Sequence, residues 1–198
     1  MKTIATVTLL GIWTSAQAQT TNDSTKITVP IYVIRNVADR NLNVSWAQGI
    51  ASSIFAEAGV RIKWPQGEPD SRKQEMPIVI NITADTPKTL VPGALACAQV
   101  FEGVHIRIFW DRVQNTVRDA NPLGTFLLAH VVAHEIAHIL EGINRHSESG
   151  VMKASWKQAE IEQMTVHPLS LDPEDVRLIR MGLLKRATRR VDGQMTCG

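Results

Sequence analysis

The chain has 198 residues, of which 44% are hydrophobic and 20% are charged, and its formal net charge is +2. These values are ordinary for a globular protein and exclude disorder or low complexity as a description of the whole chain. Nucleic-acid-binding proteins normally carry an excess of clustered Lys and Arg, which a net charge of +2 does not indicate. We therefore expect no nucleic-acid partner. The length fits one domain with one hydrophobic core.

Residues 1–18 have the pattern of a secretory signal peptide. Lys2 precedes a short apolar run over residues 4–13, and Ala16-Gln17-Ala18 forms a cleavage site with two small residues. The apolar run is too short to span a bilayer. We therefore expect cleavage after Ala18, and a secreted or periplasmic mature protein over residues 19–198 with no membrane segment.

Strand-like and helix-like segments follow one another along the mature chain. Apolar residues at every second position indicate strands, as at Ile27, Val29 and Ile31, and apolar residues four apart indicate the first helix. The predicted strands are residues 26–35, 60–64, 77–83, 94–101 and 104–110, and the predicted helices are residues 41–58, 121–141, 155–165 and 172–185. This order predicts an α/β fold with a mixed, mostly parallel, twisted sheet and a small C-terminal helical part.

The longest apolar helix contains the sequence His134-Glu135-Ile136-Ala137-His138. Residues four apart lie on one helix face, so His134 and His138 can bind the same zinc ion. Glu135 is turned by about 100° from His134, which places its carboxylate beside the metal, where a general base accepts a proton from water. The alternative interpretation is two core histidines and a surface Glu.

A catalytic zinc site normally takes three protein ligands, so a third residue is needed. The next histidine is His146, which follows the helix-ending Gly142 and precedes Met152 by six residues. Glu160 and Glu162 on the following predicted helix are alternative third ligands, as in thermolysin-like enzymes. Two further residues of the long helix are not expected to bind metal. Glu141 is expected to be a partner of a ligand or a solvated residue at the helix end, and His130 is expected to contact a ligand or to pack in the core.

The segment from His134 to Met152 resembles the metzincin group of zinc metalloproteases, in which HExxH is followed by a Gly, a third His and a turn that carries a Met. The resemblance implies one zinc ion bound by His134, His138 and His146, with Glu135 as the general base. It also implies Gly142 as the residue that ends the helix and Met152 as the Met of the turn. The spacing differs, because seven residues separate the second and third His instead of five. On the strict spacing, Asn144 would occupy the third position.

The resemblance also gives an expected organisation: one zinc metallopeptidase-like domain over residues 19–198. Residues 19–142 would supply the sheet and the active-site helix, and residues 143–198 a C-terminal subdomain with the Met-turn. Residues 94–100 would form an antiparallel edge strand along the cleft. Lys153 and Trp156 would line a substrate pocket, with Trp156 as a core aromatic being the alternative.

Two cysteines, Cys97 and Cys197, are the only pair in the chain. An oxidising compartment would permit a disulfide between them, and two unpaired thiols are the alternative.

The sequence as a whole predicts a secreted zinc-dependent endopeptidase that acts on a peptide or protein substrate. A zinc amidase or peptidase on cell-wall peptides and a non-catalytic zinc-binding module of the same fold remain open. Only a few residues separate Ala18 from the first predicted strand, so no inhibitory propeptide is expected.

Overall fold

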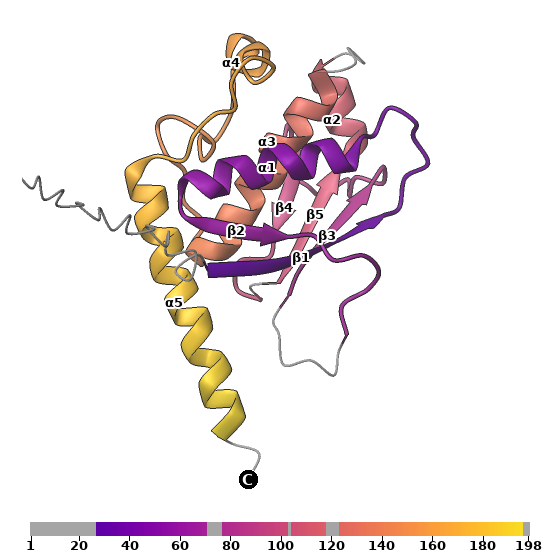
Figure 1. Ribbon diagram of the computed structural model, residues 1–198. Helices are drawn as coiled ribbons and strands as arrows, with labels where there is room; N and C mark the ends of the chain where they lie inside the picture. The colour runs from indigo at the N-terminus through magenta and orange to yellow at the C-terminus, as the bar shows by residue number, and fades with distance from the viewer. Residues whose placement is uncertain (1–26, 71–76, 103, 118–122, 196–198) are drawn as a thin grey trace, which may run out of the picture.

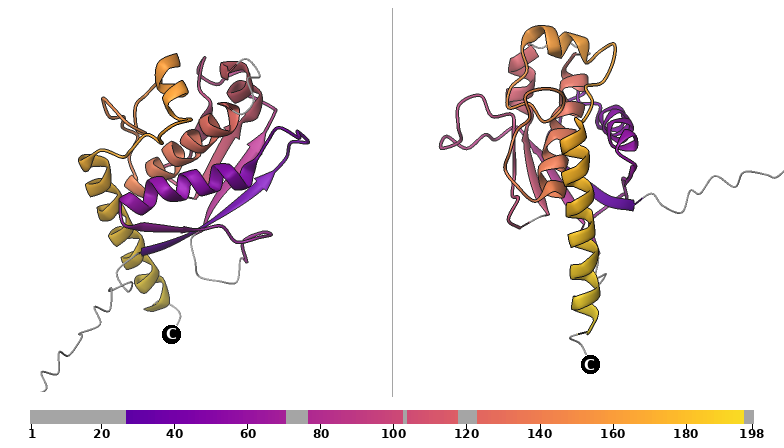
Figure 2. Two further views of the ribbon diagram at one scale, coloured as in Figure 1. Left: turned by 45° about the horizontal axis from the view of Figure 1, so that its top comes forward. Right: turned by 90° about the vertical axis from the view of Figure 1, so that its left-hand side faces the viewer.

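The structure is a computed structural model that describes residues 27–70, 77–102, 104–117 and 123–195. In these residues, five strands form one sheet, and helices α1 and α3 pack together against it (Figures 1 and 2). The strands are β1 (Ile27–Arg35), β2 (Val60–Lys63), β3 (Ile78–Thr83), β4 (Ala96–Ala98) and β5 (His105–Phe109). The helices are α1 (Val44–Glu57), α2 (Trp110–Val117), α3 (Leu123–Glu141), α4 (Gln158–Gln163) and α5 (Pro173–Met195). The predicted signal peptide and Cys197 lie outside the described residues.

The sheet has the strand order β2-β1-β3-β5-β4. Strand β1 pairs in parallel with β2 and β3, and β3 pairs in parallel with β5. Strand β4 is antiparallel to β5 and lies at the edge, with Cys97 opposite Arg107. The predicted mixed, mostly parallel sheet is therefore confirmed. The edge strand covers only Ala96–Ala98, which is shorter than the predicted residues 94–101.

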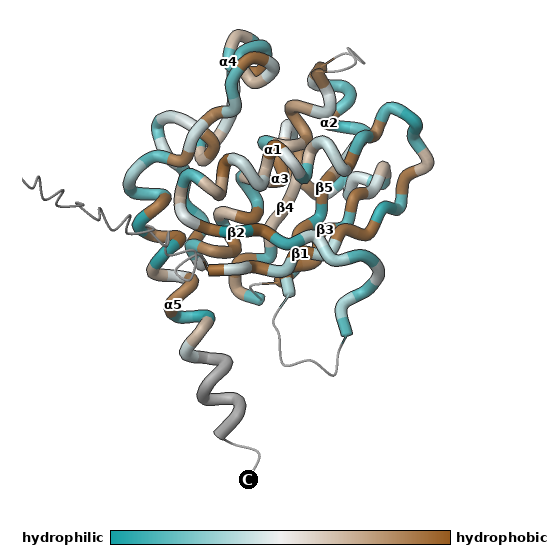
Figure 3. Tube along the Cα trace, viewed as in Figure 1, coloured by the Kyte–Doolittle hydropathy of each residue, from teal (hydrophilic) through white to brown (hydrophobic). Residues whose placement is uncertain are grey.

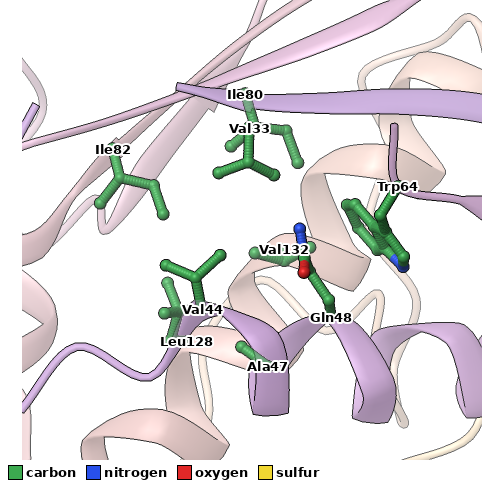
Figure 4. Close-up of a pocket in the computed structure, with 9 residues that line it drawn as sticks. All are labelled: Val33, Val44, Ala47, Gln48, Trp64, Ile80, Ile82, Leu128 and Val132. Carbon is green, nitrogen blue, oxygen red and sulfur yellow. The ribbon is translucent and has the colours of Figure 1, made fainter. Parts of the chain in front are cut away.

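One face of the sheet is covered by helices, and the side-chain pattern shows why. In β5, Ile106 and Ile108 are buried while His105 and Arg107 are exposed, as expected when alternate side chains point to opposite faces. Figure 4 shows Val33, Ile80 and Ile82 of the sheet facing side chains from α1 and α3. The gap between them is only about 10 Å³, which is room for at most one water molecule.

Helix α3 is the central element of the core. Every residue from Leu127 to Glu141 is buried. By length and composition alone, the helix is long and apolar enough to cross a membrane. The share of that apolar window buried inside the protein is 89%, which is the behaviour of a core helix. The hydropathy view shows the apolar residues of α3 beneath α1 (Figure 3).

The apolar residues four apart that predict the first helix are Leu42, Trp46, Ile50, Ile54 and Ala58, and of these Leu42, Ile54 and Ala58 are buried in or beside helix α1. The buried side of this helix also includes alanines. Its buried residues are Ala47, Ala51, Ile54 and Phe55, whereas Trp46 of the predicted stripe is 58% exposed. Alanines at the contact allow α1 to approach α3 closely. The indole ring of Trp46 instead lies edge-on to Phe126, with 6.1 Å between ring centroids.

Helix α2 was not predicted, because the alternating pattern of β5 continues into Trp110. That residue begins the helix, and its indole N–H donates a hydrogen bond to the Asp39 carboxylate at 2.7 Å. Trp110, Val113 and Val117 are the buried residues of α2, and their spacing of three and four was the available helix signal. The other helices were placed correctly, but α4 is shorter than residues 155–165, and α5 continues to Met195 instead of ending near Lys185.

Helix α5 begins at the expected cap and packs tightly on α3. The Asp172 carboxylate accepts hydrogen bonds from the backbone N–H groups of Glu174 and Asp175, both at 2.9 Å. Further along, a Cβ atom added at Gly182 would overlap the backbone carbonyl of Leu140. Glycine at this position is therefore what allows the two helices to touch.

This contact gives a testable prediction. Gly182→Ala should lower the free energy of unfolding by about 1–3 kcal/mol or more, because the new methyl group must push α5 away from α3. Gly49→Ala is the matched control, since a Cβ there meets nothing within 4 Å, and it should stabilise the protein by about 0.5–1 kcal/mol. Chemical denaturation measures both. Equal stability of Gly182→Ala and the wild type would contradict the contact.

Candidate metal centre

His134 and His138 lie one turn apart on α3, and each is oriented by a backbone carbonyl from outside the helix. The Nδ1–H of His134 donates to the carbonyl of Val151 at 2.8 Å, and that of His138 to the carbonyl of Ile143 at 3.4 Å. A carbonyl only accepts, so Nδ1 carries the proton in both rings. The Nε2 atom of each neutral ring is then a free lone pair.

The Nε2 atoms that carry these lone pairs lie only 3.0 Å apart. Such a contact is repulsive without a positive charge between the atoms. Two nitrogen ligands of one tetrahedral zinc ion stand about 3.3 Å apart, given Zn–N bonds of about 2.0 Å. The observed pair therefore fits a shared metal ion.

His146 completes the cluster. Its ring centroid lies 5.3 Å from that of His134 and 5.1 Å from that of His138. One nitrogen from each of the three rings lies within 4.8 Å of the others. His134 and His138 are buried, whereas His146 is exposed, so the cluster opens to solvent on the His146 side.

The electrostatic environment keeps the buried rings in the form that binds metal. Burial, with a further contribution from His146, lowers the pKa of His134 to about 4. Burial and the neighbouring His134 and His146 lower the pKa of His138 to about 4 as well. Both imidazoles are therefore neutral at neutral pH, and neutral imidazole is a common zinc ligand.

Glu135 lies beside the cluster and faces the edge strand. The side chain is buried, and the backbone N–H of Ala98 in β4 donates a hydrogen bond to it. Burial raises the pKa of Glu135 to about 8. A cation held by the adjacent histidines would lower this pKa, because an opposite charge favours the carboxylate. The arrangement places a proton acceptor next to the three candidate ligands.

The turn after α3 brings His146 back toward the helix. Gly142 has a φ of +71°, and its N–H donates to the carbonyl of His138 at 3.0 Å, so the helix ends there. Met152 is completely buried, and its carbonyl accepts a hydrogen bond from the N–H of Ser147 at 2.7 Å. The predicted helix-ending Gly and turn Met thus lie on either side of the third histidine.

The alternative third ligands are engaged elsewhere. The Glu160 carboxylate accepts hydrogen bonds from Lys153 at 2.7 and 2.8 Å and from the N–H of Lys157 at 2.8 Å. Glu162 accepts from Gln158 at 3.0 Å. Within the described residues, neither carboxylate joins the histidine cluster.

Glu141 is not the solvated helix end that was considered. The residue is 5% exposed, and neither carboxyl oxygen has a hydrogen-bond partner among the described residues. Burial and the nearby Asp175 raise the pKa of Glu141 to about 8. The neutral acid is therefore its main form at neutral pH, which reduces the cost of burying it.

His130 is a structural link rather than a ligand. Its Nδ1–H donates to the carbonyl of Phe126 at 2.7 Å, and its Nε2 accepts from the backbone N–H of Leu169 at 2.9 Å. Both ring nitrogens are used, so neither is available to a metal. The ring joins α3 to the segment that precedes α5.

A groove of about 600 Å³ runs along the cluster between β4 and the segment after the turn. Its lining is mostly apolar and includes Leu95, Val131 and Trp156. The Trp156 ring lies edge-on to His134, with 5.7 Å between centroids, and its N–H donates to the carbonyl of Gly150. Lys153 also lines the groove, but its ammonium is paired with Glu160.

Cys97 lies on β4 at the groove and is exposed. Although the residue as a whole is exposed, partial burial of its thiol group and the nearby Glu135 raise the pKa of Cys97. Cys97 is not part of the histidine cluster. No disulfide involves Cys97 within the described residues. The pairing with Cys197 stays a prediction, since Cys197 is outside that part of the chain.

Comparison with known proteins supports the fold. A solved structure of archaemetzincin from Methanopyrus kandleri is similar to this chain, with a TM-score of 0.53 and 14% sequence identity. The match covers 84% of this chain and 99% of that chain. No protein-family model and no curated protein matches the sequence. The chain therefore shares the mixed α/β fold of this archaemetzincin structure, and within that fold three histidines of the chain come together.

The buried position of His130 predicts a pH-dependent contribution to stability. Burial lowers the pKa of His130 below its ordinary value, so the folded protein keeps the ring neutral while the unfolded chain takes up a proton near pH 6.5. His130→Phe keeps a ring but removes the acceptor of the Leu169 N–H, which should cost about 1–3 kcal/mol at pH 8.

The difference in unfolding free energy between the wild type and His130→Phe should shrink as the pH falls below about 6.5, because only the wild type loses stability by protonating His130 in the unfolded state. Denaturation with a chelator present removes any effect of metal. His167→Phe, which replaces an exposed histidine by the same residue, is the control variant. A difference that is constant with pH would rule out this account of His130.

Proposed function

We propose that the protein is a secreted zinc-dependent endopeptidase. The observation that carries the proposal is the convergence of His134, His138 and His146 beside Glu135 at an open groove. The fold that the chain shares with archaemetzincin supports the proposal. Secretion is supported by the signal-peptide pattern of residues 1–18.

The three imidazoles would hold one zinc ion, with His134 and His138 oriented by backbone carbonyls and His146 lying on the solvent side. When bound, zinc polarises the scissile carbonyl and makes water more acidic. A structural zinc site normally has four protein ligands, whereas a catalytic site has three and an open position. Three histidines next to a groove match the catalytic type.

Glu135 would act as the general base and then as the general acid. Its carboxylate takes one proton from the attacking water as the new C–O bond forms, and returns that proton to the amide nitrogen as the C–N bond breaks. The hydrogen bond from the Ala98 N–H holds the carboxylate against β4, next to the place where the peptide would lie. Burial excludes bulk water from the Glu135 side chain.

The substrate would bind as an extended peptide along the edge strand β4. No described strand pairs with the outer edge of β4, since its other edge pairs with β5, so a peptide could add there through main-chain hydrogen bonds beside the Ala98 N–H that binds Glu135. Side-chain selectivity would come from the pocket lined by Trp156. Because Glu160 neutralises Lys153, this pocket is expected to favour apolar over acidic side chains.

Zinc content tests the ligand assignment. The wild type should bind one zinc ion per chain, and His134→Ala or His146→Ala should lose most of it, because two remaining imidazoles bind zinc weakly. His167→Ala removes an exposed histidine outside the cluster and should bind zinc as the wild type does. Retention in His146→Ala together with loss in Glu160→Ala would favour the carboxylate alternative.

Hydrolysis tests the role of Glu135. Glu135→Gln keeps the shape of the side chain but cannot accept the proton, so kcat should fall by about 10²–10⁴-fold while zinc content is unchanged. Cleavage of a peptide library by both proteins, with Glu162→Gln as the control, measures this. Stoichiometric zinc without any cleavage by the wild type would favour a non-catalytic zinc-binding module.

A further inference from the structure

The segment that carries the third histidine is tied to the start of α5. We refer to residues 143–152 as the third-ligand loop. Both neighbours of His146 donate to the same oxygen: Arg145 Nη1 to Asp175 Oδ1 at 2.8 Å, and Ser147 Oγ to Asp175 Oδ1 at 2.6 Å. Arg145 also donates to Ser147 Oγ at 3.0 Å. The three side chains thus form a closed triangle of contacts, and two of them belong to the chain neighbours of His146.

Asp175 is well placed to act as an anchor. Its side chain is completely buried, whereas that of Arg145 is 28% exposed. Its second oxygen, Oδ2, accepts from the N–H of Asp172 at 3.0 Å, and Asp172 in turn accepts from the N–H of Asp175. The carboxylate therefore belongs both to the cap of α5 and to the third-ligand loop.

Helix α5 is itself fixed relative to the other two histidines. Gly182 lies against the backbone of Leu140 in α3, the helix that carries His134 and His138. A chain of contacts thus leads from α3 through α5 and Asp175 to the loop. Two helices set the position of His146, although it follows α3 by only five residues.

The His146 ring needs such support. The rings of His134 and His138 are each held by a carbonyl at Nδ1, but no hydrogen bond holds the His146 ring within the described residues. The ring is also exposed, so packing constrains it little. Its direction therefore depends on the backbone on either side of it, at Arg145 and Ser147.

We propose that Asp175 is a positioning residue, which holds His146 toward His134 and His138 through Arg145 and Ser147. This inference rests on the proposed function, because it concerns zinc binding by the three histidines. It assigns a role in the metal site to a residue of the C-terminal helix, far from the HExxH segment in sequence.

The experiment changes the loop side of the triangle, because Asp175→Ala would also remove part of the cap of α5. Arg145→Ala and Ser147→Ala each break one of the contacts to Asp175. Arg177→Ala is the matched control: it removes an arginine that pairs with Glu174, another acidic residue in the first turn of α5, without touching the loop. Ser147→Thr keeps a hydroxyl group and should therefore keep the hydrogen bond to Asp175.

The first measurement is the zinc dissociation constant, obtained by competition with a chromophoric chelator. Arg145→Ala and Ser147→Ala should weaken zinc binding by about 10- to 100-fold, the usual effect of removing a group that orients a ligand. Arg177→Ala and Ser147→Thr should bind as the wild type does. Thermal melting of the metal-free proteins checks that each variant folds. If Arg145→Ala does not fold, the zinc affinity of Ser147→Ala alone tests the inference.

The second measurement is the visible absorption spectrum with Co²⁺ in place of zinc, which reports the number and geometry of ligands. The loop variants should shift toward the spectrum of His146→Ala, an effect that loss of stability alone does not produce. Wild-type affinity and spectrum in both loop variants would overturn the inference and leave the proposed function intact. No zinc binding by the wild type, or unchanged binding by His146→Ala, would overturn the three-histidine site and the inference with it.

Discussion

Helix α3 carries ionisable side chains through the centre of the core, and the need to give its histidines hydrogen-bond partners shapes its surroundings. A buried polar group without a hydrogen bond costs stability, so each partner is held in place by the group that it satisfies. His134 binds the carbonyl of Val151, His138 that of Ile143, and His130 the N–H of Leu169. The segment after α3 is therefore fixed on this helix at several points.

The part of the site that lies on one helix could be predicted from the sequence. The positions of His134, Glu135 and His138 relative to one another follow from helical geometry, and α3 is long and apolar enough to be recognised. The cap at Asp172 and the turn at Gly142 are likewise local signals, and α3 and α5 end and begin there. The positions of the five strands along the chain also follow from their patterns, although the shortness of β4 does not.

Features that depend on contacts between distant residues could not be predicted in this way. Lys153 and Glu160 form an ion pair, so Glu160 is not available as a zinc ligand and the charge of Lys153 in the pocket is neutralised. Neither consequence can be read from the two residues separately. The exposure of Trp46 was missed because the residue is apolar, and the buried alanines of α1 carry little signal in the sequence. The burial of Glu141 depends on where α5 lies.

The unusual spacing of the third histidine has a structural explanation in the turn itself. Asn144, at the position expected from the strict spacing, lines the groove, while His146 reaches the cluster from two residues further on. Gly142 and Gly150 both have positive φ, so the chain can reverse direction at each end of the longer segment. The hydrogen bond from Ser147 to Met152 then closes the loop just after His146. The position of His146 is thus set by the points at which the loop is closed and anchored. The number of residues between His138 and His146 can differ as long as the loop closes at these points.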